Sequence, residues 1–153
     1  MKMTTRASTI LVLPLALAGT AATGSLLMPA PAEARDAVIY KSPTCGCCRG
    51  WAAYLQRSGY HVTVVDHEDM DAVKDGLGVP ADMRSCHTAK IGGYVVEGHV
   101  PAEAVDKLLD DQPRVIGIAA PGMPSGSPGM DGPKEPNRVY LFTGSEHSPH
   151  GTY

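Results

Sequence analysis

Apolar and polar residues along the chain alternate between the period of a strand and that of a helix. Four consecutive apolar residues at 37–40 predict a short buried strand, and the β-branched alternation at 61–66 predicts a second one. Between them, apolar residues recur at helical spacing and a glycine follows, so residues 48–58 are expected to form a helix. A shorter helical pattern occupies residues 70–77. The first half of the chain therefore predicts a β-α-β-α order.

The second half of the chain predicts a hairpin and a further helix. Two short strands at 88–91 and 94–97 flank the pair Gly92-Gly93, which is typical of a tight turn. Pro101 is well placed as the first residue of a helix that ends before the next proline. The resulting order, β-α-β-α-β-β-α, predicts an α/β domain with a small mixed sheet of the thioredoxin-like kind. Another small α/β sandwich fold can have the same order of elements, so this alternative stays open.

The C-terminal third begins with a loop. Eight of the thirteen residues at 121–133 are Gly or Pro, so this Gly/Pro/Met-rich segment, which contains Met123 and Met130, predicts no regular element. Residues 139–142 are apolar again and predict an added C-terminal strand. The last residues, 144–153, are polar and are expected to form a disordered tail.

Residues 1–34 have the features of a secretory signal peptide. Two basic residues open the segment, residues 10–18 are apolar, and residues 32–34 fit the small-x-small cleavage rule. We therefore expect cleavage after Ala34, which leaves a folded domain over residues 35–143 and the polar tail. An N-terminal membrane anchor is the alternative, but the apolar run is short for a span. Export implies a periplasmic location.

Composition narrows the class of function. The sequence has 13 Lys and Arg against 16 Asp and Glu, a formal net charge of −3, so no basic stripe is available to bind a nucleic-acid backbone. No apolar run outside the signal segment has the length of a membrane span. The four cysteines are too few for a disulfide-dense scaffold, and three of them lie within four residues. In an oxidising compartment such thiols indicate a metal, a disulfide or catalysis.

The cysteines favour a metal site. Cys45, Cys47 and Cys48 lie between the first strand and the first helix, whose N-terminus stabilises thiolates. Cys45 and Cys48 have the C-x-x-C spacing of a redox dithiol, but Cys47 is a competing partner for a disulfide and a third soft ligand for a metal. Cys86, just before the third strand, stands where thioredoxin-like proteins keep a proline that covers the dithiol. Cysteine can bind a metal there, whereas proline cannot.

Other interpretations of the cysteines stay open. One is a structural disulfide, Cys45–Cys48 or Cys48–Cys86, in a domain that binds other proteins. Another is zinc, since the cysteine loop with Cys86 and His87 could make a tetrahedral site. A third is a thiol-disulfide oxidoreductase that uses the Cys45/Cys48 pair.

Methionine and histidine supply further candidate ligands. Met123 and Met130 lie in a Gly/Pro loop with no core to fill, and thioethers favour Cu(I). Packing as a hydrophobic lid is the alternative. Two methionines together with four thiols favour copper over zinc. His87, beside Cys86, is the best imidazole candidate and His99 the next, although each alone is more often structural.

Four ordered motifs resemble a bacterial family long described as a domain of unknown function, which contains the CopG copper-resistance proteins. The motifs are the cysteine loop with Trp51 and the segments 85–89, 93–102 and 121–130. The resemblance extends over about residues 37–143. It implies a thioredoxin-like fold, export, a role in copper resistance, and a metal surrounded by Cys45, Cys47, Cys48, Cys86 and Met123.

We therefore expect an exported copper-binding protein of copper homeostasis. We expect it to bind Cu(I), either as one ion or as a polynuclear cluster, and copper binding could be linked to thiol oxidation. The expected ligands are Cys45, Cys47, Cys48, Cys86, Met123 and His87. Copper ions are the expected partner, together with other periplasmic copper-handling proteins. Whether the protein stores, delivers or changes the oxidation state of copper stays open, and so does enzymatic activity.

Overall fold

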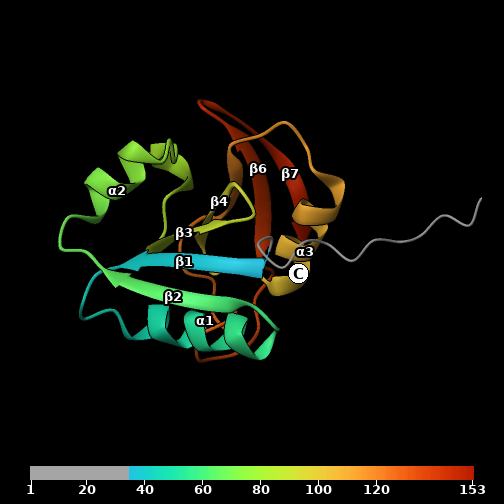
Figure 1. The fold of residues 1–153 in the computed structure, drawn as a ribbon. Helices are drawn as coiled ribbons and strands as arrows, with labels where there is room; N and C mark the ends of the chain where they lie inside the picture. Colours follow the sequence, from blue (N-terminus) through green and yellow to red (C-terminus); the bar gives the residue numbers. More distant parts are fainter. Residues whose placement is uncertain (1–34) are drawn as a thin grey trace, which may run out of the picture.

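Seven strands form one mixed sheet at the centre of the structure, a computed structural model that describes residues 35–153 (Figure 1). The order across the sheet is β2-β1-β3-β4-β5-β6-β7. The strands are β1 (Asp36–Lys41), β2 (His61–Asp66), β3 (His87–Ile91), β4 (Tyr94–Gly98), β5 (Gly117–Ala120), β6 (Arg138–Thr143) and β7 (Glu146–Thr152). The helices are α1 (Gly46–Arg57), α2 (Met70–Gly76) and α3 (Ala102–Asp111), with a 3₁₀ turn, η2 (Ala81–Met83). The predicted α/β class is confirmed.

The pairing of the strands follows from how they are connected. β1 and β2 are parallel and joined by α1, and β3 runs antiparallel to β1 on its other side. β3 and β4 form the predicted hairpin, which turns at Gly92 and Gly93 with φ of 55° and 86°, a backbone conformation that glycine adopts without strain. After α3, β5 pairs parallel with β4, and β6 and β7 extend the sheet antiparallel.

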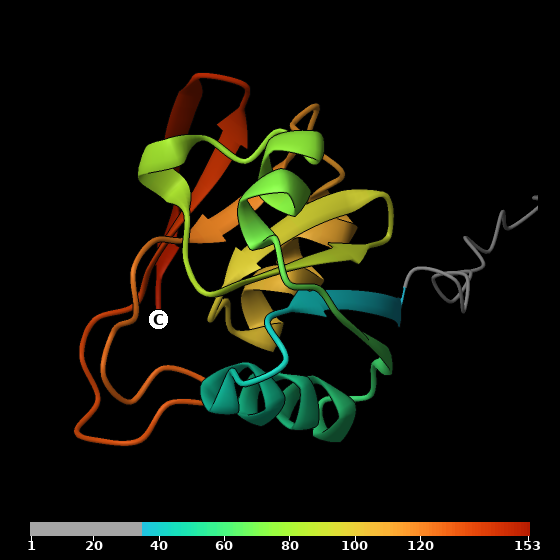
Figure 2. The same cartoon turned by 90° about the vertical axis from the view of Figure 1, so that its left-hand side faces the viewer.

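The two faces of the sheet are buried by different elements. Alternate residues of a strand point to opposite faces. Val96 and Ile118 pack with apolar residues of α1 and α3, whereas Val95 and Ala119 pack with Met83 of η2. Helices α1 and α3 therefore cover one face, and the segment after α2 covers the other. Figure 2 shows α1 and α2 at separate places around the sheet.

Strand β5 is an element that the apolar pattern does not predict. It has four residues, all buried, and consists of one isoleucine with glycine and alanine, which have low strand propensity. Its position between β4 and β6 supplies the pairing that the side chains do not favour. A Cβ atom at Gly117 would lie 1.9 Å from the carbonyl oxygen of Val95, so this close approach requires glycine.

The expectation of a disordered C-terminal tail is wrong, because most of the tail forms β7 and pairs along β6. Backbone pairing needs no apolar side chains, and Pro149 is tolerated because β7 is an edge strand. Polar contacts also fix this segment. His147 Nε2 lies 3.2 Å from Asp82 Oδ2, and His150 Nε2 lies 3.1 Å from the carbonyl oxygen of Ala104.

The predicted signal peptide, residues 1–34, lies outside the described residues and stays a prediction. Within residues 35–153, none of the helices combines the length and the apolar character needed to cross a membrane. The thioredoxin-like assignment also stays a prediction, although the mixed sheet and its helices are those of an α/β protein.

Candidate metal centre

The start of α1 positions the cysteine loop. Cys45 is the N-cap residue, and its Sγ accepts a hydrogen bond from the backbone N–H of Cys48 at 3.3 Å. The helix therefore begins at Gly46, two residues earlier than the apolar pattern predicts, and Cys47 and Cys48 lie in its first turn. This places three sulfur atoms at a helix N-terminus, where free N–H groups stabilise negative charge.

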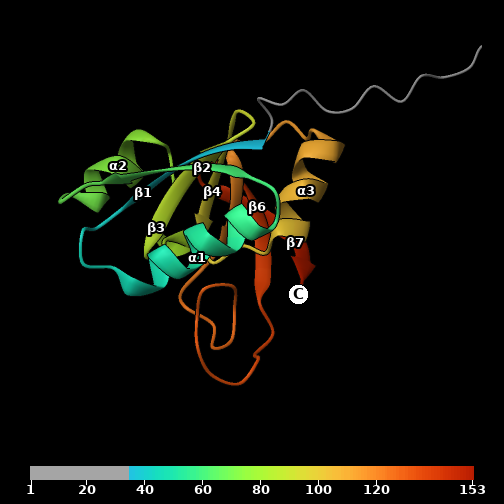
Figure 3. The same cartoon turned by 60° about the horizontal axis from the view of Figure 1, so that its bottom comes forward.

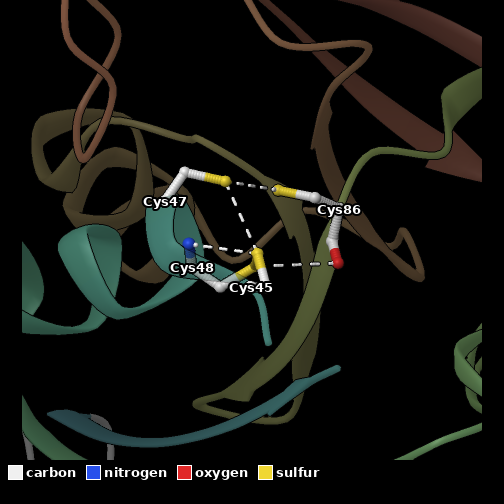
Figure 4. Close-up of side chains that lie close together, drawn as sticks. All are labelled: Cys45, Cys47, Cys48 and Cys86. Carbon is white, nitrogen blue, oxygen red and sulfur yellow. Dashed lines mark hydrogen bonds between the residues drawn. A yellow bond between two sulfur atoms is a disulfide. The ribbon is translucent and has the colours of Figure 1, made fainter. Parts of the chain in front are cut away.

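All four cysteine sulfurs lie together, within 4.8 Å of one another (Figure 4). Cys45 and Cys48 are joined by a disulfide, whereas Cys47 and Cys86 are free thiols. The Cys47 sulfur is 3.5 Å from the Cys45 sulfur and 3.8 Å from the Cys86 sulfur. The fold thus brings Cys86 to the loop from 39 residues away in the sequence. Of the disulfide pairings left open by the sequence, Cys45–Cys48 is the one formed.

Cys86 is held in place through a buried carboxylate. Glu97 Oε1 accepts hydrogen bonds from the backbone N–H of Ser85 and from Lys74 Nζ, both at 2.6 Å. Its other oxygen accepts from the Thr88 hydroxyl at 2.6 Å. Glu97 and Lys74 are both buried. The sequence offers one signal for this network, an acidic residue within an otherwise apolar strand, but nothing in the pattern identifies Lys74 as its partner.

The environment of Cys86 controls its protonation and its access to solvent. Burial raises the pKa of the Cys86 thiol to about 12, with a smaller contribution from the nearby Cys47 sulfur. The thiol is therefore protonated at neutral pH. A metal that binds this sulfur must displace the proton. Cys86 also lines a cavity of about 550 Å³ whose wall includes Asp69, Met70 and Asp71. Acidic side chains therefore lie in the wall of the cavity that Cys86 lines.

Two buried histidines contact the Cys86 sulfur. His99 Nε2 lies 3.0 Å from Sγ and His87 Nδ1 lies 3.3 Å from it, and the three atoms form a second group of candidate ligands. Burial lowers the pKa of both imidazoles, so both rings are neutral. Trp51 packs against His87 with ring centroids 4.4 Å apart. The sequence favours His87 over His99, but the structure brings both to the sulfur, and His99 is the closer.

The Gly/Pro/Met-rich loop is attached to the centre at three points. The Ser85 hydroxyl donates to the carbonyl of Gly122, and His99 Nδ1 lies 2.8 Å from the carbonyl oxygen of Pro128. Gly129 packs directly against the backbone of Trp51 in α1. Figures 2 and 3 show the loop reaching the N-terminal end of α1. The loop therefore contacts both the helix that carries Cys47 and Cys48, with Cys45 as its N-cap, and the segment that carries Cys86.

Met123 follows the anchored Gly122 along this loop. This residue is 58% exposed, while Met130 is partly buried. Met123 thus lies one residue from an attachment point of the loop, and its role as a ligand stays a prediction.

Gly129→Ala is expected to detach the loop from α1. Gly129 has φ of 83°, and a Cβ there would lie 2.4 Å from the backbone nitrogen of Trp51, which cannot move aside. Gly144→Ala is the matched control, since Gly144 has φ of 59° and open space around it. The control should lose about 1–2 kcal/mol for the left-handed backbone alone. Gly129→Ala should lose about 1–3 kcal/mol more in urea unfolding, because overpacking adds to that cost. Equal losses would contradict the close loop contact.

The donor set fits a soft metal ion. Thiolates and neutral imidazoles suit Cu(I), and thiolates with imidazole also suit zinc. His87 Nε2 is buried and has no hydrogen-bond partner among the described residues. With Cys45 and Cys48 reduced, four sulfurs and two imidazoles would converge on one small volume.

The fold and this centre define an α/β protein with a four-cysteine cluster able to ligate metal. A family described as a protein of unknown function, DUF411, matches residues 83–130. Two solved chains are similar over most of the described domain, and both are copper resistance protein CopG, in forms 1 and 2. Each is 41% identical to this chain with a TM-score of 0.73.

The first of these matches covers 79% of this chain and 98% of the solved chain, and the second covers 77% and 97%. The chain therefore belongs to the CopG-type copper resistance family, as the sequence motifs indicate. A comparison with functionally curated proteins finds no match.

Proposed function

We propose that the protein binds Cu(I) in the periplasm through its four reduced cysteines. The observation that supports this most directly is the convergence of four sulfurs within 4.8 Å. One Cu(I) ion needs fewer ligands than the site offers, and thiolates can bridge two ions, so we propose a small polynuclear Cu(I)–thiolate cluster. Membership of a copper resistance family favours copper over zinc. Export rests on the predicted signal peptide.

Met123 and His87 complete the proposed ligand set. His87 Nδ1 already lies 3.3 Å from the Cys86 sulfur. Met123 lies next to the point where the loop is bound to Ser85, beside Cys86. Its thioether needs no deprotonation to bind Cu(I), which suits a ligand that exchanges the ion with other periplasmic copper-handling proteins.

Formation of the proposed cluster requires reduction of the Cys45–Cys48 disulfide. A dithiol partner can do this by exchange: its two thiols lose two electrons and two protons and become a disulfide, while Cys45 and Cys48 become thiols. Cys45 is the accessible sulfur for the first attack, because Cys48 is fully buried. Thiol oxidation state and copper capacity are therefore linked.

The proposal is tested by anaerobic titration of the reduced mature chain with Cu(I) against a chromogenic chelator. We expect uptake of more than one ion per chain. Reduced protein whose thiols have been alkylated is the control and should bind none at the cluster. A ratio that saturates at one would exclude the polynuclear form, and copper retained entirely by the chelator would contradict the function.

A second candidate function is thiol-disulfide exchange on other proteins. The disulfide at the N-terminus of α1 favours it, since this is the position that lowers a thiol pKa. The metal-free reduced chain would then reduce insulin with turnover. Activity together with failure to bind copper would make this function the better one.

A further inference from the structure

The disulfide does not involve every ligand of the centre. Cys47 and Cys86 stay free when Cys45 and Cys48 are joined, and both imidazoles still contact Cys86. The group formed by Cys86, His87 and His99 has its sulfur and nitrogen atoms within 4.8 Å of one another in this oxidised form. We call these three residues the mixed-ligand group.

We propose that the mixed-ligand group is a second copper position, which binds one Cu(I) while the Cys45–Cys48 disulfide is intact. The inference rests on the proposed copper function, since Cys86 is shared with the four-thiol cluster. Oxidation of Cys45 and Cys48 would then lower the copper capacity to one ion per chain rather than to zero.

The ring of His99 is oriented as a metal ligand. A carbonyl oxygen can only accept a hydrogen bond, so the 2.8 Å contact with Pro128 requires the proton of His99 to be on Nδ1. The lone pair of Nε2 then faces the Cys86 sulfur at 3.0 Å. Metal-binding histidines are oriented in this manner, with the other ring nitrogen donating to a backbone carbonyl.

The backbone around His99 is fixed as well. The side-chain amide of Asn137 donates to the His99 carbonyl at 2.8 Å, and both residues are buried. The loop that provides Pro128 is attached at Gly122 and Gly129. His99 is therefore held at both its ring and its main chain before any metal arrives, which reduces the cost of ordering a ligand.

His87 contributes the third ligand atom. Its ring packs against Trp51 and meets the ring of His99 edge-on, with centroids 4.9 Å apart. Its Nδ1 faces the Cys86 sulfur, and its Nε2 has no partner among residues 35–153. Packing therefore orients this ring toward the sulfur.

Binding is a simple exchange of a proton for a metal ion. The Cys86 thiol releases its proton to solvent as the sulfur bonds to Cu(I), and both imidazoles are already neutral. No electron is transferred, and the disulfide is unchanged. One thiolate with two imidazoles is a three-ligand set of soft and intermediate donors that suits Cu(I).

The test compares copper uptake by the disulfide form and by the reduced form. The mature chain is prepared with two free thiols per chain and titrated anaerobically with Cu(I) against a chelator. We expect one ion per chain, and more in the reduced form. The Cys45→Ser/Cys48→Ser variant cannot regain these thiols and should also bind one ion.

Trp51, the single tryptophan, should lose fluorescence on binding because His87 packs against it.

His99→Ala should weaken binding to the disulfide form by more than the roughly 10–100-fold that loss of an outer-shell partner costs. His61→Ala is the matched control, because His61 is exposed on β2 and outside the group, and it should change nothing. If His99→Ala fails to fold by circular dichroism, Cys86→Ser provides the same test with a smaller change.

The outcomes separate the two proposals. Copper uptake by the reduced form but not by the disulfide form overturns the mixed-ligand position and leaves the four-thiol function intact. Uptake by neither form overturns both. Uptake by the disulfide form that is insensitive to His99→Ala and Cys86→Ser also overturns the mixed-ligand position.

Discussion

Cys86→Ser is expected to lower the Cu(I) affinity of the reduced chain by at least about two orders of magnitude, more than loss of an outer-shell partner costs. Cys86 is the cysteine that the fold brings to the loop from the segment just before β3, and its sulfur belongs to both groups of candidate ligands. Without it, the three loop sulfurs have no sulfur ligand opposite them, and both imidazoles lose the sulfur that they face. Chelator competition measures the affinity and the number of ions bound.

Ser42→Ala is the control for this prediction. Ser42 lines the same cavity as Cys86, but it provides no sulfur and should leave the affinity unchanged. Thermal unfolding should show that Cys86→Ser keeps its fold, because the oxygen replaces a half-buried sulfur that lies outside the main core. Full affinity in Cys86→Ser would mean that the loop cysteines suffice and that the site does not extend to β3.

The elements predicted well from the sequence are those with a strong local signal. β1 and β2 are apolar or β-branched runs, the β3–β4 hairpin has a glycine pair, and α3 begins next to Pro101. The cysteine loop is predicted because strand, cysteines and helix are adjacent in the chain. Elements that depend on partners are missed. β5 has weak propensity and β7 has polar side chains, and each exists because a neighbouring strand offers its backbone.

The same distinction applies to the metal centre. The four cysteines are identifiable from residue type and spacing, and the position of Cys86 before a strand suggests that it meets the loop. The orientation of His99 depends on the carbonyl of Pro128, 29 residues away, so no local pattern indicates it. The pairing of Lys74 with Glu97 likewise joins α2 to β4 across 23 residues. Such contacts follow from tertiary packing alone.

The Lys74–Glu97 pair connects the stability of the fold to the position of Cys86. Glu97 is fully buried and cannot be hydrated, so its charge depends on Lys74 and on hydrogen bonds from Ser85 and Thr88. The Ser85 hydrogen bond comes from the residue that precedes Cys86. The hydrogen bonds of this carboxylate therefore stabilise the hairpin and also hold one ligand at the loop.

Lys74→Met should produce the largest loss of stability of the changes considered, about 3–5 kcal/mol, because it leaves a buried carboxylate without its counter-ion. The free energy of unfolding in urea measures the loss. Lys107→Met is the matched control: Lys107 pairs with Asp111 on the exposed face of α3, and such solvent-exposed pairs contribute little to stability, so this variant should unfold like the unchanged chain.

The double variant Lys74→Met/Glu97→Gln distinguishes a charge effect from a packing effect. Glutamine is neutral, so the missing ammonium no longer matters, while its carbonyl oxygen still accepts the hydrogen bond from Ser85. If the unpaired charge causes the loss, the double variant should regain most of the stability that Lys74→Met loses, as buried ion pairs replaced by neutral groups often do. No recovery would mean that the Lys74 side chain stabilises the fold by packing between α2 and β3, and the electrostatic account of the pair would be wrong.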